Sequence, residues 1–171
     1  MKNYDIPMIK TAYVWAEQSY CVRSKVGSIL SKDGRIVSVG YNGTISGAEN
    51  CCEDISDEPC EECSGEGYFE TPGVMSCDCG KCSGTGKKLV SKDTVVHAEA
   101  NALMFAAKNG IETDGCTIYV TLSPCIECSK LIIQSGIKRV VYSEDYRKTD
   151  GIDFLRKHGV NVMKLSKEEC K

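Results

Sequence analysis

The sequence has no long apolar segment. Its longest unbroken apolar run covers six residues, 102–107, whereas a helix that spans a membrane needs about 20. The first residues are polar and charged, with no apolar stretch behind them, so we expect neither a membrane span nor a secretory signal. We therefore expect a cytoplasmic protein. Its 171 residues are enough to bury a full core in one domain without help from disulfides.

Basic charge is also scarce. The chain carries 21 basic and 24 acidic side chains, a formal net charge of −3. Proteins that bind polynucleotides usually present a basic face, since neutralising several phosphates provides their affinity. This balance disfavours DNA or tRNA as the substrate, but it is compatible with a mononucleotide, which needs few cations.

Histidine is scarce, with 2 residues, whereas cysteine is abundant, with 12. In a reducing cytosol, clustered cysteines bind metals or take part in chemistry more often than they form disulfides. Their spacing agrees, because a Cys-x-x-Cys pair places two thiolates close enough to share one zinc ion. Three such pairs occur: Cys60 with Cys63, Cys79 with Cys82, and Cys125 with Cys128.

Residues 50–92 differ from the rest of the chain in composition. They contain seven cysteines, six glycines, nine acidic and four basic residues, and few aliphatic side chains. Such a segment cannot form an apolar core of its own, so it must be held by metal or be disordered. We expect a single domain over residues 1–171 that contains residues 50–92 as a zinc-binding insertion.

Outside this insertion, apolar periodicity predicts alternating helices and strands. Helices are expected over residues 6–18, 97–109, 124–135 and 152–158, and strands over 26–30, 35–40, 116–122, 138–143 and 160–165. Asp33-Gly34 predicts a hairpin between the first two strands. The later strand–helix–strand order implies parallel strands with covering helices. We therefore expect an α/β fold, a three-layer α/β/α sandwich around a mixed sheet of about five strands.

Four residues carry the clearest chemical pattern: His97, Glu99, Cys125 and Cys128. The first two begin one predicted helix and the cysteines begin the next, so the two helix N-termini can converge on one side of the sheet. The helix dipole favours thiolates there. One imidazole and two thiolates bind Zn²⁺ and leave its fourth position to water, whose pKa falls to about 7. Glu99 is then placed to act as the catalytic residue that moves protons between water and substrate.

Each part of this pattern has a simpler interpretation when it stands alone. A lone Cys-x-x-Cys pair is more often structural than catalytic, and a lone histidine at a helix start is more often an ordinary polar residue. The full order, His-x-Glu followed by Pro-Cys-x-x-Cys, is the signature of zinc nucleobase deaminases. The alternative from another class is a non-catalytic zinc protein whose insertion binds a partner, although such a protein has no use for Glu99.

Four segments resemble deoxycytidylate (dCMP) deaminases, especially those of bacteriophages: Ser24-Lys25-Val26-Gly27, Gly40-Tyr41-Asn42-Gly43, His97-Ala98-Glu99-Ala100-Asn101-Ala102 and Thr121-Leu122-Ser123-Pro124-Cys125-Ile126-Glu127-Cys128. The resemblance implies the cytidine deaminase fold and zinc-dependent hydrolysis of dCMP to dUMP and ammonia, which supplies dUMP for dTMP synthesis. The zinc motif is shared with deaminases of cytidine, free bases and tRNA adenosine, so these substrates are the alternative within the enzymes.

The resemblance also implies contacts with the substrate. Asn42 would contact the deoxyribose hydroxyl, and the backbone at Ala98 and Ser123 would read the edge of the pyrimidine. Tyr146 would lie near the sugar and the phosphate; the alternative for this side chain is a partly buried packing aromatic.

Two basic residues precede the first strand, Arg23 and Lys25, and they are our candidates for the phosphate; the alternative for both is solvated charge. The resemblance further implies a homohexamer that is activated by dCTP and inhibited by dTTP, with Mg²⁺ accompanying the nucleotide. In the family, the loop at residues 44–50 helps to form this effector site.

Cys60, Cys63, Cys79 and Cys82 form a complete Cys₄ set in a repeated Cys-x-x-Cys-x-Gly-x-Gly segment. The repeat resembles the zinc module of DnaJ-type chaperones. Four ligands leave no open position, so we expect a structural zinc that braces a loop. The alternatives are a chaperone-like binding module and a DNA-binding ribbon, and the acidic balance disfavours DNA.

Phage relatives hold a further structural zinc with cysteines at the positions of Cys21 and Cys51. A carboxylate two residues before the catalytic histidine also binds that zinc in them. This chain has Val95 at that place, which cannot bind a metal. A second structural zinc would therefore need Cys77 or Cys52 to complete its ligands.

Overall fold

The computed structural model describes residues 2–70 and 75–169. These residues form two compact units. The sheet unit consists of residues 2–19, 25–43 and 96–169, and the insertion unit consists of residues 20–24, 44–70 and 75–95. The insertion unit thus contains the cysteine- and glycine-rich segment together with a short piece of chain from before the first strand.

The sheet unit is built on one mixed five-stranded sheet with the order β2-β1-β7-β8-β9. Its strands are β1 (Gly27–Lys32), β2 (Arg35–Tyr41), β7 (Thr117–Leu122), β8 (Arg139–Glu144) and β9 (Asn161–Lys164). β1 is antiparallel to both β2 and β7, whereas β7, β8 and β9 run parallel. This confirms the predicted mixed sheet of five strands.

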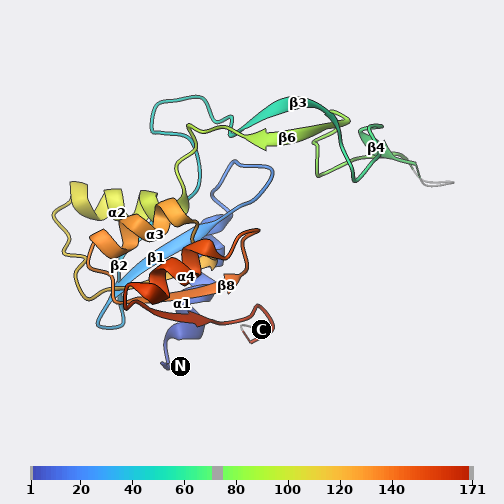
Figure 1. Ribbon diagram of the computed structural model, residues 1–171. Helices are drawn as coiled ribbons and strands as arrows, with labels where there is room; N and C mark the ends of the chain where they lie inside the picture. Colours follow the sequence, from blue (N-terminus) through green and yellow to red (C-terminus); the bar gives the residue numbers. More distant parts are fainter. Residues whose placement is uncertain (1, 71–74, 170–171) are drawn as a thin grey trace. The chain divides into compact units, whose positions relative to one another are not determined.

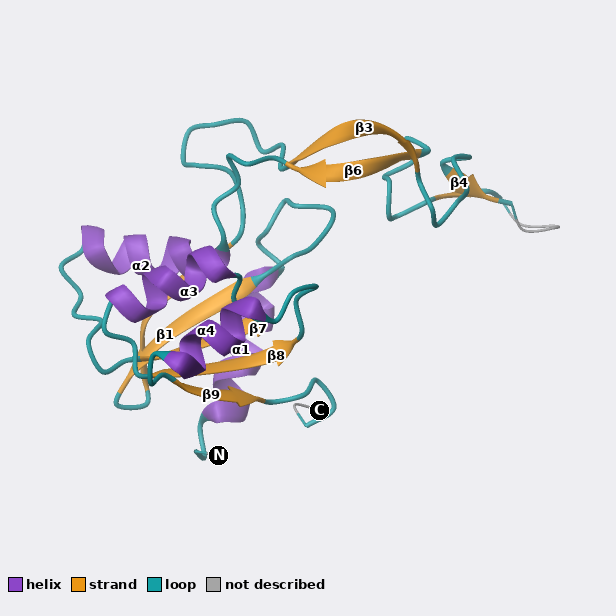
Figure 2. Cartoon of the chain, in the orientation of Figure 1, coloured by secondary structure: helices purple, strands orange, loops and turns teal. Residues whose placement is uncertain are grey.

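Four helices cover the two faces of this sheet: α1 (Asp5–Ala16), α2 (Ala98–Lys108), α3 (Ile126–Gln134) and α4 (Asp150–Lys157). α1 packs on one face, in an apolar cluster with Ile29 and Tyr119. α2, α3 and α4 pack on the opposite face, in a second cluster with Leu30 and Ile118. Figures 1 and 2 show this arrangement, which confirms the expected three-layer α/β/α sandwich.

The order of these elements determines where α3 begins relative to the sheet. The turn between β1 and β2 uses Asp33 and Gly34 with φ of 50° and 77°, as a two-residue hairpin requires. The parallel pairs β7–β8 and β8–β9 are joined by α3 and α4, and right-handed crossovers put both helices on the same face. α3 therefore begins just beyond the carboxyl end of β7, where open α/β sheets usually bind their ligands.

A buried ion pair ties α1 to the sheet. Asp5 is fully buried and accepts hydrogen bonds from the Arg139 guanidinium at 2.7 and 2.8 Å and from the Tyr119 hydroxyl at 2.9 Å. Burial by itself would raise the pKa of Asp5, but these bonds and one from the Lys2 N–H outweigh it and lower the pKa to about 2. The carboxylate therefore links the first helix to β7 and β8.

The insertion unit contains two short antiparallel pairs. β3 (Glu53–Pro59) pairs with β6 (Lys87–Ser91), and β4 (Tyr68–Phe69) pairs with β5 (Cys77–Asp78). Most side chains of β3 and β6 are exposed, and Leu89 is buried. The sequence did not predict this hairpin, because strands rich in charge show no apolar alternation. In neither unit does a described helix have the length and apolar character needed to cross a membrane.

Candidate active site and metal groups

Two helices begin at the predicted metal ligands. His97 is the N-cap of α2 and Cys125 is the N-cap of α3, both with extended backbone, and Cys128 lies in the first turn of α3. α2 and α3 are neighbours on the same face of the sheet. The first N–H groups of a helix have no partner within it and favour negative charge nearby. The fold therefore brings the imidazole and both thiols to a place that favours thiolates.

The distances within this group fit a zinc ion. His97 Nδ1 lies 3.5 Å from Cys125 Sγ and 3.3 Å from Cys128 Sγ, and the ligand atoms all lie within 4.8 Å of one another. A tetrahedral zinc ion with ordinary Zn–N and Zn–S bonds holds such atoms roughly 3.6 Å apart. Three protein ligands leave a fourth position for water, as in catalytic zinc sites.

Hydrogen bonds among the three ligands shift their pKa values. A hydrogen bond with the Cys128 thiol lowers the pKa of Cys125 to about 3, against the effect of burial and with help from His97. The same bond, together with burial, raises the pKa of Cys128. The pKa of His97 is raised by its bond with Cys125. One thiolate is therefore already favoured, and a metal ion would displace the remaining thiol proton.

Glu99 is a buried acidic side chain beside these ligands. It lies in the first turn of α2, two residues after His97, and is 4% exposed. Burial raises the pKa of Glu99 to about 7, against a backbone hydrogen bond and the nearby His97, and its side chain contacts the Cys128 thiol. A carboxyl group with a pKa near 7 can both accept and donate a proton at neutral pH.

The start of α4 supports the start of α3. A Cβ atom on Gly151 would lie 2.1 Å from the carbonyl oxygen of Pro124, and Ser129 Oγ donates a hydrogen bond to the Gly151 carbonyl at 3.0 Å. The chain next to Cys125 is therefore packed directly against the backbone of α4. Gly151 could not be predicted from the sequence, because no local signal marks a contact between two helices.

Asn42 is buried just beyond β2 and forms hydrogen bonds with the Val26 backbone. Its Oδ1 accepts a bond from the Val26 N–H at 2.7 Å, and its own N–H donates to the Val26 carbonyl at 3.1 Å. The next residue, Gly43, exchanges backbone bonds of 2.8 and 3.1 Å with Val96. Because Val96 directly precedes His97, this bridge brings the expected sugar-binding residue next to a metal ligand.

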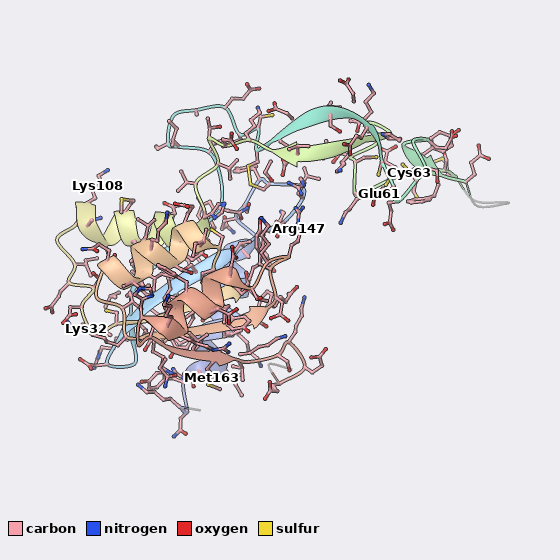
Figure 3. The ribbon with its side chains drawn as sticks, viewed as in Figure 1. Lys32, Glu61, Cys63, Lys108, Arg147 and Met163 are labelled. Atoms are coloured by element: carbon pink, nitrogen blue, oxygen red, sulfur yellow. A yellow bond between two sulfur atoms is a disulfide. The ribbon has the colours of Figure 1, made fainter. Side chains whose placement is uncertain are left out.

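Ser123 connects the start of α3 to Tyr146. The Ser123 N–H donates to the Glu144 carbonyl at 2.8 Å, and its Oγ accepts from the Tyr146 N–H at 2.7 Å. The ligand contact expected of the Ser123 backbone would therefore use its carbonyl oxygen, whereas Ala98, first in α2, would use its N–H. Tyr146 is half-buried, and Arg147 beside it is exposed in the loop between β8 and α4 (Figure 3).

The two expected phosphate ligands belong to different units. Arg23 lies in the insertion unit, where its Nη1 donates to Ser91 Oγ at 2.8 Å and its N–H donates to Glu53 at 3.1 Å. Lys25 is exposed at the beginning of the segment that leads into β1. Of the two, Lys25 is the one that shares a unit with His97.

The insertion holds the second group of close metal ligands. Cys60, Cys63, Cys79 and Cys82 are all buried, and their sulfur atoms lie within 4.8 Å of one another. The Cys60–Cys79 and Cys63–Cys82 sulfurs are 4.0 and 3.8 Å apart. Tetrahedral zinc holds thiolate sulfurs roughly 3.8 Å apart, so this group also fits zinc. Figure 3 labels Cys63 in this part of the chain.

The two cysteine–glycine repeats pack against each other in a reciprocal way. The Cys60 N–H donates to the Gly86 carbonyl and the Cys79 N–H donates to the Gly67 carbonyl, both at 2.8 Å. A Cβ atom on Gly86 would lie 2.2 Å from the Gly65 carbonyl oxygen. The repeats therefore meet through their backbones, which explains why these turns contain glycine.

The structure does not bring Cys21, Cys51 and Cys77 together as a further ligand set. Cys21 forms a disulfide with Cys52, Cys51 Sγ lies 3.2 Å from Lys92 Nζ, and Cys77 lies in β5. Over residues 2–70 and 75–169, neither group of close metal ligands includes them. A second structural zinc at this place stays a prediction, with Cys52 rather than Cys77 as the neighbour of Cys21.

Comparisons with known proteins agree with the fold. The sequence matches the family model of MafB19-like deaminases over residues 2–170. It is 35% identical to the deoxycytidylate deaminase of Enterobacteria phage T4, over 94% of this chain and 89% of that protein. It is also 35% identical to the human deoxycytidylate deaminase, over 81% of this chain and 64% of that protein.

A solved structure extends the similarity to three dimensions. The crystal structure of the dCMP deaminase of cyanophage S-TIM5, in complex with dCMP and dUMP, is 38% identical with a TM-score of 0.74 and covers 96% of this chain and 99% of that one. Sequence, fold and ligand geometry thus lead to one conclusion: the protein belongs to the MafB19-like deaminase family.

Proposed function

We propose that the protein is a zinc-dependent enzyme that hydrolyses dCMP to dUMP and ammonia. The observation that carries this proposal is the convergence of His97, Cys125 and Cys128 at two helix N-termini beside the buried Glu99. The similarity to phage dCMP deaminases over almost the whole chain supports dCMP as the substrate. The product would feed dTMP synthesis.

The residues of the site divide the chemistry between them. His97, Cys125 and Cys128 would hold a zinc ion, which would supply a water molecule activated at neutral pH. Glu99 would take one proton from that water and deliver it to N3 of cytosine, and it would then move the second proton, from the hydroxyl added at C4, to the departing amine. The pKa of about 7 for Glu99 suits both directions of transfer. Water supplies the oxygen bonded to C4 of dUMP, and the amino group leaves as ammonia.

The substrate is held by residues around the metal ligands. The Ala98 N–H and the Ser123 carbonyl read the edge of the pyrimidine, and Asn42 contacts the deoxyribose hydroxyl. Tyr146 lies near the sugar and phosphate, and Lys25 neutralises the phosphate. The hydrogen bond from the Tyr146 N–H to Ser123 Oγ supports this grouping.

A second zinc ion has a structural role in the proposal. Cys60, Cys63, Cys79 and Cys82 bind it with no open position, in a unit where these four cysteines are themselves a buried cluster. The metal then replaces the apolar core that the insertion lacks.

Our proposal for the assembly and its regulation rests on the resemblance to dCMP deaminases. We propose a homohexamer that is activated by dCTP and inhibited by dTTP, with Mg²⁺ accompanying the effector. Its place would be the cytoplasm, or the host's cytoplasm if the chain is viral. The loop at residues 44–50 is the segment to test for effector binding.

The test is ammonia release from dCMP, with cytidine, CMP and a short single-stranded DNA in parallel, each with and without dCTP. We expect turnover of dCMP that rises with dCTP. Turnover of the unphosphorylated or polymeric substrates alone would keep the zinc ligands and Glu99 in their roles but reject dCMP. No turnover of any substrate by the zinc-loaded protein would reject the catalytic proposal.

A further inference from the structure

Asn101 on α2 makes a hydrogen bond that leaves its own helix. Its backbone N–H donates to the His97 carbonyl at 2.9 Å, as expected within a helix. Its side-chain Nδ2 donates to the carbonyl oxygen of Tyr41 at 2.9 Å, across to the last residue of β2. The side chain thus joins the helix that begins at a metal ligand to the residue before Asn42.

Three other contacts hold the same two segments together. Ser38 Oγ donates to the Ala102 carbonyl at 2.7 Å in the buried interior. A Cβ atom on Gly40 would lie 2.3 Å from the Ala98 carbonyl oxygen, so the strand backbone lies directly on the helix backbone. The bridge between Gly43 and Val96 closes the other end of this contact. The end of β2 is therefore fixed to the first turns of α2 on both sides of Asn42.

Among these contacts, the bond from the Asn101 side chain reaches the peptide group that joins Tyr41 to Asn42. We infer that Asn101 is a positioning residue for recognition of the nucleotide sugar: by holding the Tyr41 carbonyl, it sets the place of the Asn42 carboxamide relative to the metal ligands. This inference rests on the proposed function, in which Asn42 contacts the deoxyribose hydroxyl. Small displacements of a positioned group weaken recognition strongly, which gives this bond a measurable effect.

The experiment compares Asn101→Ala with wild type, using the holoenzyme. Alanine is the best helix former, so the substitution keeps α2 intact. We expect dUMP binding, measured by calorimetry, to weaken about 3- to 10-fold, the range that loss of one neutral hydrogen bond gives. The KM for dCMP rises by a similar factor, kcat changes less than about 2-fold, and zinc content is unchanged.

The matched ligand is 2′,3′-dideoxy-UMP, which lacks the 3′-hydroxyl. If Asn101 acts through Asn42, its substitution weakens binding of this ligand less than about 2-fold, because the contact that it positions is already missing. Asn101→Asp keeps the size but puts an acceptor against the Tyr41 carbonyl, so we expect it to weaken dUMP binding at least as much as alanine.

Asn109→Ala is the control variant. Asn109 lies at the other end of the same helix, and its Nδ2 also donates to a backbone carbonyl, that of Phe105 at 2.8 Å. We expect it to leave both ligands unaffected. If Asn101→Ala weakens the binding of dUMP and of dideoxy-UMP equally, or weakens neither, the positioning role is overturned. Turnover of dCMP by the wild-type enzyme would still support the proposed function in that case. Absence of dCMP turnover in wild type would instead reject the proposed function.

Discussion

The carboxyl group of Glu99 has a feature that a structural metal site does not require: it is buried beside two accessible ligands, His97 and Cys125. We expect Glu99→Gln to keep its zinc but to lose roughly 10²–10⁴-fold in kcat, because the amide cannot shuttle a proton. Ammonia release and metal analysis measure the two quantities. The control is Glu127→Gln, an exposed glutamate in the first turn of α3 that pairs with Lys130. Substantial turnover by zinc-loaded Glu99→Gln would reject the role.

Asp5 makes stability depend on pH in the acid range. Its pKa is about 2 in the folded chain against an ordinary value of 3.8, so the folded state favours the ionised form. The resulting stabilisation, roughly 2 kcal/mol, is present above about pH 4 and is lost as the pH falls toward 2. Asp5→Asn should remove this part of the acid dependence in urea unfolding curves.

The same substitution should also cost stability at neutral pH. It leaves the Arg139 guanidinium, whose side chain is 13% exposed, without its carboxylate, and breaking a buried pair in this way costs about 3 kcal/mol. Asp153→Asn is the control, since the Asp153–Arg156 pair is exposed and such pairs contribute less than about 1 kcal/mol. Equal effects of the two variants at pH 7 would contradict the role of the buried pair.

At the scale of elements, apolar periodicity predicted the sheet unit within a few residues at each end. All four helices and the strands β1, β7 and β8 contain buried apolar residues that the sequence pattern shows directly, whereas β2 and β9 have no apolar side chain that is fully buried. Crossover handedness then orders the parallel strands. The ligands could be predicted because they begin helices, where capping and proline signals are local. The β3–β6 hairpin and the Cys21–Cys52 disulfide could not, since charged strands lack periodicity and a pairing across 31 residues leaves no local mark.

Among contacts between elements, we expect the packing of α4 against the start of α3 to be sensitive to substitution. Gly151→Ala would place a Cβ atom 2.1 Å from the Pro124 carbonyl oxygen and 2.8 Å from the Cys125 carbonyl carbon. The backbone at Cys125 must move, so we expect a loss of about 1–3 kcal/mol and weaker zinc binding in competition with a chelator. Gly80→Ala, where a Cβ meets nothing within 4 Å, should leave zinc binding by His97, Cys125 and Cys128 unchanged. Wild-type zinc affinity in Gly151→Ala would show that α4 does not hold the ligands.

At the scale of the whole molecule, the two units differ in what holds them together. The sheet unit has an apolar cluster on each face of its sheet. In the insertion unit, the buried cluster is formed by Cys60, Cys63, Cys79 and Cys82. A structural metal contributes its binding free energy directly to folding, so loss of the second zinc should unfold the insertion while the sheet unit keeps its core.

The double variant Cys63→Ser/Cys82→Ser separates the two metals. We expect zinc content to fall from two ions per chain to one, and limited proteolysis to cut within residues 53–91, while the remaining ion stays with His97, Cys125 and Cys128. Cys125→Ser should also leave one ion, but with turnover abolished and the insertion still resistant. Cys77→Ser, which removes an exposed thiol of the same unit, should keep both ions. Two ions in the double variant would mean that the insertion's cysteines do not hold zinc. The insertion's resistance to proteolysis would then have to come from the β3–β6 ladder and the reciprocal glycine contacts alone.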